Sequence, residues 1–308
     1  RITLRTILGP NGTLIAKAGD NTSLETIDAS SITGIQVDKG KKIVLTAKPD
    51  NDKAVVWTVN NQPTNELSNT YTIDAISENT TVKADFVALE LCTIPQNSDT
   101  SADYTISEVT KYPKDYGTDG QIRKGGTLSF KLTPKKPVMG LQGLPDNAQV
   151  VYNSDGSYTV TVTNVTSDIS FQMKEYRAKT GNLQIPSEYT ESTLKSALRK
   201  QIHSSVSGSD IAYLDIKLQI KTRSNPDVWE DVTSANFPQG GIDITILYSA
   251  LGQSGLDSSY NYSVAHMLEN GTVENLSAKG GTSGVTFHVN SLSPFAIGWY
   301  KASSPSGG

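Results

Sequence analysis

Cysteine and histidine are scarce in this chain of 308 residues. Cys92 is the only cysteine, so the chain can form no internal disulfide and no cysteine-rich metal site. The three histidines, His203, His266 and His288, lie far apart, and none has a partner at a metal-binding spacing such as H-x-x-x-H. We therefore expect no cofactor and no metal centre. We expect Cys92 to be a small apolar residue inside a strand or linker.

Long apolar runs and excess positive charge are also lacking. No apolar stretch approaches the roughly 20 residues of a membrane-spanning helix, and the opening residues RITLRTILGP contain no signal-peptide core. We interpret the chain as a mature or excised piece, so that any export signal or anchor lies outside it. A net charge of −4 and a pI of ≈ 5.5 give no broad positive field for phosphate backbones. We expect neither a membrane span in this piece nor a nucleic-acid partner.

The composition that remains is typical of a folded β protein with many turns. Hydrophobic residues make up 36% of the chain and charged residues 19%, and Ser, Thr, Asn, Gly and Tyr are plentiful. The length of 308 residues exceeds what one hydrophobic core normally organises. We therefore expect two or three modules.

One pattern occurs twice at a domain-sized interval. KGKKIVLTAKP, residues 39–49, returns as KGGTLSFKLTP, residues 124–134. The segments that follow are AVVWTV (54–59), YTIDAI (71–76) and TVKADF (81–86) in the first copy, and AQVVYN (148–153), YTVTVTNV (158–165) and ISFQM (169–173) in the second. Most of them alternate apolar and polar residues as β-strands do. We predict an all-β module over residues 1–88 (module 1) and a second copy of it over residues 89–177 (module 2).

Residues 178–302 have a different pattern and are predicted to form module 3. SEYTESTLKSALRKQIHS (187–204) begins with a Ser/Thr-rich candidate cap and then carries apolar residues at the spacing of one helix face, at Leu194, Ala197, Leu198 and Ile202. The later segments with strand character are AYLDIKLQIKT (212–222), GGIDITILYS (240–249), YNYSVAHML (260–268) and GVTFHV (284–289). We predict one short helix beside an antiparallel sheet stack, followed by a linker tail over residues 303–308.

The repeated stretches resemble a known class of module. GIQVDKGKKIVLTAKPDNDKAVVWTVNN and YTIDAISENTTVKADF, with YTVTVTNVTSDISFQM in the second copy, resemble the divergent β-rich repeat modules of Gram-positive cell-surface proteins. The likeness covers about half of residues 1–177.

Module 3 contains three further stretches with a recognisable pattern, VWEDVTSANFPQGGIDITILYS, YNYSVAHML and GVTFHVNSLSPFAIGWYKAS. They are similar to the C-terminal module of large clostridial and lachnospiraceal surface proteins. The fixed points of the pattern are Trp229, Asp231, Val232, Thr233, Phe237, Pro238, Gly240, Gly241, His266, Met267, Leu292, Ser293, Pro294, Ile297, Gly298 and Trp299. ILYSALGQSG (246–255) departs from it, because the family has a Pro-containing turn after the tyrosine. The resemblance implies a cell-envelope setting and supplies no catalytic residues.

Catalytic motifs are not apparent. The chain has no G-x-S-x-G elbow and no Cys/His signature. Carboxylates such as Asp210 with Asp215, or Glu230 with Asp231, could meet in space, but a glycosidase pair is defined by its separation across a cleft. His266 shares a strand face with Tyr262 and Val264, so we expect a hydrogen-bonded histidine near a sheet edge or loop.

The three tryptophans differ in their surroundings. Trp57 lies among valines and Trp299 shares a face with Phe295 and Ile297, so we expect both in the core. Trp229 is flanked by Asp227, Glu230 and Asp231 and is our one candidate ligand-binding residue. A packing role for Trp229 is the alternative.

The sequence thus predicts a mainly β protein of three serial, Ig-like β-sandwich modules, the third with one short α-helix. We expect a non-enzymatic, extracellular segment of a bacterial cell-surface protein, associated with the cell surface or cell wall, that acts as a stalk, spacer or adhesin-like scaffold. The alternative is a module of an adhesin or secreted enzyme that binds a host or cell-wall glycan or a matrix protein. We expect a monomer.

Overall fold

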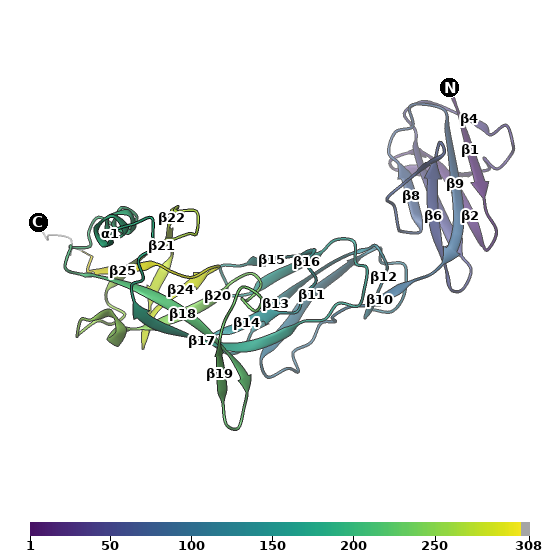
Figure 1. The fold of residues 1–308 in the computed structure, drawn as a ribbon. Coiled ribbons are helices and arrows are strands. Elements are labelled where there is room, and N and C mark those ends of the chain that lie inside the picture. Colours follow the sequence, from purple (N-terminus) through teal and green to yellow (C-terminus); the bar gives the residue numbers. More distant parts are fainter. Residues whose placement is uncertain (303–308) are drawn as a thin grey trace, which may run out of the picture.

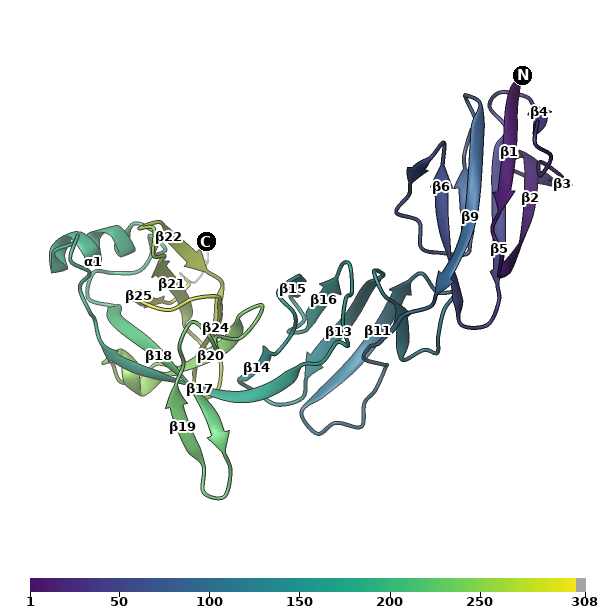
Figure 2. The same ribbon diagram turned by 45° about the vertical axis from the view of Figure 1, so that its right-hand side comes forward.

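The computed structural model describes residues 1–302 and shows three modules that follow one another along an extended molecule (Figure 1). The protein is mainly β, with 50% of its residues in strands, 4% in helical structure and one helix in the described part. Figure 2, turned by 45°, shows the same succession, with the N-terminus in one end module and residue 302 in the other. Each module has a buried apolar cluster of its own. The predicted fold class, a mainly β protein of several modules with one helix, is confirmed.

Module 1 is a sandwich of two sheets. Its strands are β1 (Ile2–Leu8), β2 (Gly12–Asp20), β3 (Ser23–Ile27), β4 (Ile35–Val37), β5 (Lys42–Pro49), β6 (Lys53–Val59), β7 (Gln62–Pro63), β8 (Thr70–Ile73) and β9 (Thr80–Ala88). One sheet has the order β4-β1-β9-β6-β7 and the other β3-β2-β5-β8. Alternating residues of both sheets point inward, and the cluster they form includes Leu4, Leu45 and Trp57, all fully buried.

Module 2 has a related arrangement. Its strands are β10 (Leu91–Thr93), β11 (Tyr104–Tyr112), β12 (Gln121–Arg123), β13 (Thr127–Pro134), β14 (Met139–Gln142), β15 (Ala148–Tyr152), β16 (Tyr158–Val162) and the start of β17 (Gln172–Asn182). β5 lies between β2 and β8 in module 1, and β13 lies between β11 and β16 in module 2. The two central strands bury matching positions, Ile43, Leu45 and Ala47 in β5 and Leu128, Phe130 and Leu132 in β13.

The repeated Lys-Gly pair has the same task in both modules. Gly40 and Gly125 have φ angles of +92° and +93°, in the region that favours glycine. The N–H of Gly40 donates to the carbonyl of Ile76, and that of Gly125 donates to the carbonyl of Val165, both at 2.7 Å. Ile76 and Val165 are buried and belong to the loop after β8 and β16 respectively. The turn therefore ties the start of each central strand to a buried apolar residue in the loop after the neighbouring strand, β8 or β16.

One expected equivalence between the two copies is wrong. The order of the segments predicts that residues 148–153 correspond to residues 54–59, but β15 pairs with β16 at the edge of the β13 sheet, whereas β6 pairs with β9 in the opposite sheet. The topological counterpart of β6 is β14, which pairs with β17. β14 has only four residues, so its sequence carries too short an alternation to be recognised.

Module 3 has three layers. Its elements are α1 (Glu191–Arg199), β18 (Ile211–Arg223), β19 (Val228–Asp231), β20 (Ile242–Leu247), a 3-10 turn (Tyr248–Leu251), β21 (Asn261–Met267), β22 (Val273–Leu276), β23 (Ala278–Gly280), β24 (Gly284–Val289) and β25 (Phe295–Tyr300). The large sheet has the order β14-β17-β18-β25-β21-β22, with β19 also beside β18, and the small sheet has the order β20-β24-β23. One apolar cluster lies between these sheets, and a second lies between the large sheet and α1.

The helix forms where the sequence predicts it. Thr190 is the N-cap, and its side chain and that of Thr193 each accept from the other's backbone N–H, which completes a capping box. Leu194 and Leu198 are fully buried against β21 and β25, and Ile202, in the turn that follows, closes the same cluster. The apolar face, rather than intrinsic propensity, fixes a helix this short.

Strand β17 belongs to two modules at once. Its first residues pair with β14 of module 2, from Gln142↔Gln172 to Met139↔Glu175. Its later residues pair with β18 of module 3, from Tyr176↔Ile220 to Asn182↔Leu214. The boundary expected between residues 177 and 178 lies within this strand. The tail expected at 303–308 lies outside the described residues.

Candidate functional site at the module junctions

A cluster of aromatic and charged side chains lies where modules 2 and 3 meet. Tyr152 on β15 donates from its hydroxyl to Asp243 on β20, over 2.7 Å. The same carboxylate lies 2.9 Å from Nδ1 of His288 on β24, and Nε2 of His288 lies 2.8 Å from the carbonyl of Gly240. The rings of Tyr152 and His288 stack with centroids 3.7 Å apart. Asp243 and His288, which lie far apart in the sequence of module 3, thus both contact the Tyr152 side chain of module 2.

The hydrogen-bond partners hold the His288 and Asp243 side chains in place. A carbonyl oxygen can only accept, so Nε2 of His288 donates to Gly240, and Nδ1 faces a carboxylate that also accepts. Burial by itself would raise the pKa of Asp243, but the hydrogen bonds from His288 and Tyr152 outweigh it and hold the pKa below its ordinary value. Both nitrogens of His288 are engaged in the junction, which leaves neither to take a proton from a substrate.

A second aromatic residue fixes the approach of the two backbones. Tyr158 on β16 is buried, and its hydroxyl donates to the carbonyl of Gly241 over 3.0 Å. Gly240 has φ +78°, and a Cβ atom there would collide with Val150 on β15. The Gly-Gly pair before β20 therefore permits both the turn and the close contact with module 2.

The segment before β20 docks on module 2 through a further set of hydrogen bonds. The hydroxyl of Tyr176 donates to the carbonyl of Asn236 over 2.9 Å, and the side-chain amide of Gln142 donates to the same carbonyl over 2.6 Å. Gln239 bonds to the backbone of Leu144 through its side chain, accepting from the N–H over 2.9 Å. Burial raises the pKa of Tyr176 to about 12, so the phenol stays protonated as a donor.

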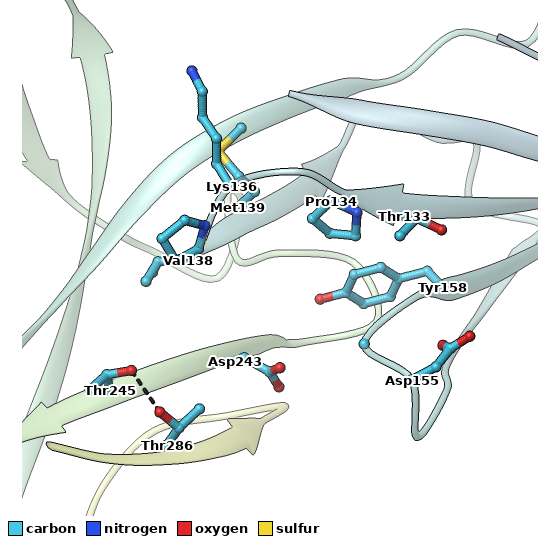
Figure 3. Close-up of a pocket in the computed structure, with 12 residues that line it drawn as sticks. Thr133, Pro134, Lys136, Val138, Met139, Asp155, Tyr158, Asp243, Thr245 and Thr286 are labelled. Atoms are coloured by element: carbon cyan, nitrogen blue, oxygen red, sulfur yellow. Dashed lines mark hydrogen bonds between the residues drawn. The ribbon is translucent and has the colours of Figure 1, made fainter. Parts of the chain in front are cut away.

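A hollow of about 310 Å³ opens beside this cluster, between β13 and β14 on one side and β20 and β24 on the other (Figure 3). Tyr158, Asp243 and Asp155 line it, and Thr245 and Thr286 close one side with a hydroxyl pair at 2.8 Å. Asp155 is held by Lys131 over 2.8 Å, and Asp243 is held by the junction. The acidic groups that face the hollow thus have structural partners, and the hollow is a space left between modules 2 and 3.

The junction between modules 1 and 2 is also centred on a tyrosine. The hydroxyl of Tyr116 accepts from the N–H of Val55 on β6 over 3.0 Å and donates to the side chain of Asn69. The guanidinium of Arg123 lies 5.3 Å from the centre of the Tyr116 ring and donates to the carbonyl of Leu67 over 2.7 Å. Tyr116 is 5% exposed and Arg123 is 7% exposed, so both are enclosed by the contact between modules.

The loop that carries Tyr116 is braced from within module 2. The ammonium of Lys111 donates to three backbone carbonyls, those of Tyr116 at 3.0 Å and of Thr118 and Gln121 at 2.8 Å each. At the rim, Asp115 accepts from the N–H of Asn69 over 3.0 Å. The loop is therefore held in place before it meets module 1, which lowers the entropic cost of forming the junction.

The three histidines lie on different elements. His266 lies inside β21, one strand in from the edge strand β22, and is 1% exposed. It bonds to Glu274 over 3.0 Å through Nδ1 and stacks on Phe295 with centroids 4.4 Å apart. The predicted hydrogen bond is present, but the ring packs in the interior. His203 follows α1 and stacks on Tyr300.

Two tryptophans are in the core, and the candidate binding residue is at the surface. Trp57 is 0% exposed and donates to the carbonyl of Ser68, and Trp299 is 2% exposed. Trp229 is half-buried on β19, with the Arg177 guanidinium 4.5 Å and the Lys221 ammonium 5.8 Å from its ring centre. These cation–π contacts order the ring. The binding role of Trp229 stays a prediction.

Cys92 and the candidate carboxylates are dispersed. Cys92 lies in β10, is 5% exposed, and burial raises the pKa of its thiol, which disfavours the reactive thiolate. Burial also raises the pKa of Asp215 on β18, while Asp231 on β19 accepts from Gln219 over 2.9 Å. The junction tyrosines and Asp243 were not predicted from the sequence.

Residues 1–302 contain no group of three or more His, Cys, Asp or Glu side chains placed to hold a metal ion. Within the same range, no helix combines the length and the apolar character needed to cross a membrane. No protein-family model, no curated protein and no solved structure matches the chain. A function is therefore inferred from the geometry of the junctions and of the modules that they join.

Proposed function

We propose that this chain is a non-enzymatic, extracellular segment of a bacterial cell-surface protein and serves as a spacer. The observation that carries the proposal is the succession of three separately buried cores joined by two hydrogen-bonded junctions. Three small cores leave more surface exposed to solvent than one large core formed by the same number of residues, because the exposed surface of a single globule grows less steeply than its chain length. In return, three modules in succession span a longer distance than a single globule does.

The junctions support a spacer of defined shape. Flexible linkers would let the modules tumble, whereas here buried side chains, among them Tyr116, Arg123 and Tyr158, bridge one module to the next. The engagement of both His288 nitrogens in the second junction argues against their use in catalysis. We therefore assign these residues a structural role, and we propose that the protein acts as a monomer.

Small-angle scattering tests the proposal. A compact globule of this length has a radius of gyration near ~19 Å, whereas three modules in a row exceed roughly 30 Å. The double variant Tyr116→Ala with Arg123→Ala removes the first junction, so its scattering should show a broader distribution of shapes than that of the unaltered chain. Ile15→Ala, at an exposed position on β2, is the matched control. A radius near ~19 Å for the unaltered chain would refute the proposal.

The second candidate function is binding of a host or cell-wall glycan or a matrix protein. It is favoured by the position of Trp229 on β19, in an arm that projects from the side of module 3 in both views (Figures 1 and 2). Stacking on an ordered tryptophan is a common way to hold a sugar ring. Binding to a glycan array that is lost in Trp229→Ala and kept in Val151→Ala, an exposed apolar control on β15, would support this function. No binding by the unaltered chain to any glycan or matrix protein would remove it.

A further inference from the structure

The first and last strands of module 1 lie side by side and run in the same direction. β1 pairs with β9 in parallel over five register pairs, from Leu4↔Thr80 to Leu8↔Ala84. The bond from the N–H of Gly9 to the carbonyl of Ala84, at 2.8 Å, extends the contact. The chain enters the module at the start of β1 and leaves it at the end of β9.

This pairing decides how the module responds to tension. A force applied through the ends of the chain pulls β1 toward its N-terminal end and β9 toward its C-terminal end. The two strands are parallel, so these forces point in opposite directions along their shared edge and load all five register pairs together. The strands must slide past each other before any part of the module can extend. Strands loaded at one common end would instead open pair by pair.

We propose that module 1 is a mechanical clamp, in which the β1/β9 pairing resists tension applied along the chain. Its biological use rests on the proposed spacer function, since a tethered spacer is pulled through its two ends. The other neighbours of these strands strengthen the clamp. β9 is also bound to β6 over seven register pairs, and β1 is also bound to β4.

Module 2 lacks a comparable pairing between its incoming and outgoing strands. Its incoming strand β10 pairs with β12 over only three register pairs. The contact that corresponds to the β1/β9 pairing is reduced to one backbone bond, from the N–H of Ile169 to the carbonyl of Thr93, over 2.8 Å. The two modules share a strand plan, yet only module 1 has a long parallel seam between its incoming and outgoing strands.

Single-molecule stretching of the whole chain in two geometries tests the clamp. In the first, handles are attached at the two ends. In the second, the N-terminal handle is moved to Asn51→Cys, in the exposed turn between β5 and β6, while the other handle stays at the C-terminal end. Both geometries use a Cys92→Ala background. Lys53 pairs with Ala88, so the second geometry opens β6 from β9 at one end, pair by pair. Modules 2 and 3 are loaded identically in both and provide an internal force standard.

The two geometries differ in extension as well as in force. Opening module 1 from its ends releases about 300 Å of chain, and opening it from residue 51 releases about 130 Å, at up to 3.6 Å per residue. In the first geometry, a variant with Arg5→Cys and Thr81→Cys identifies the module 1 event, because a crosslink between this register pair abolishes that event alone on oxidation.

We expect the module 1 event to need a several-fold higher force from the ends than from residue 51. Equal forces in the two geometries would overturn the clamp. That result would leave the spacer proposal standing, since the latter depends on the radius of gyration. A compact scattering shape would in turn remove the spacer and leave the measured clamp intact.

Discussion

Because the three cores are separate, a substitution in one core should destabilise mainly its own module. Ile43 on β5 and Leu128 on β13 occupy matching positions in modules 1 and 2, and both are 0% exposed. Replacing either by alanine removes three carbon groups at about 0.8 kcal/mol each, or about 2.4 kcal/mol of transfer free energy. The cavity that remains adds to this, so each variant should lose about 3–4 kcal/mol in the free energy of unfolding of its own module.

Amide hydrogen exchange, read by mass spectrometry, locates the loss. Ile43→Ala should lower protection in β1–β9 and leave β18–β25 unchanged, because the module 1 cluster shares no residue with the cluster of module 3. Leu128→Ala should lower protection in module 2 and also in β17, which module 2 shares with module 3. The asymmetry between the two variants follows from the shared strand alone.

Ile15→Ala on β2, at a side chain that is 54% exposed, should change stability by less than about 0.5 kcal/mol. If Ile43→Ala lowered protection in β20–β25 as much as in β5, the three cores would be one cooperative unit. The reasoning from separate interiors would then be wrong.

Three further predictions concern a turn, a cap and a charge. Gly40→Ala should cost module 1 about 1–2 kcal/mol from the positive φ alone, since a Cβ there meets no atom within 4 Å, and Gly40→Asn should cost less in the same urea titration. Thr190→Ala should cost about 1 kcal/mol by removing the N-cap of α1, seen as faster amide exchange in Glu191–Arg199, with Ser192→Ala as the control. The depressed pKa of Asp243 means that its contribution to the junction is complete above about pH 4 and is lost as pH falls through the folded-state pKa, so scattering should show modules 2 and 3 loosening in acid. Asp243→Asn should be looser at neutral pH and show less of this response, and an unchanged acid response in that variant would exclude Asp243 as its cause.

Much of the fold could be predicted because its signals are local. The helix at Glu191–Arg199 follows from its apolar spacing and its Ser/Thr cap, and the central strands β5 and β13 follow from an alternation that repeats with the Lys-Gly turn. These features need no information about distant residues. They gave the strand-rich class and the positions of most elements.

The pairing partners could not be predicted, because sequence alternation shows which face a residue uses and not which strand lies beside it. The β1/β9 seam joins residues more than seventy positions apart, and β15 has an ordinary edge-strand sequence whose partner only the fold reveals. The junction residues were missed for the same reason. Tyr152, Asp243 and His288 become a group only when two modules meet, and the abundance of tyrosine was the one signal in the composition.

The shared strand β17 also limits how this protein can be divided. Cutting between residues 177 and 178 would divide β17, separate Tyr176 and Arg177 from Ile220 and Gln219 on β18, and leave newly unpaired strand edges on both fragments. Such edges invite self-association, so modules 2 and 3 should be produced, transplanted or inherited as one indivisible unit, whereas module 1 can be exchanged by itself.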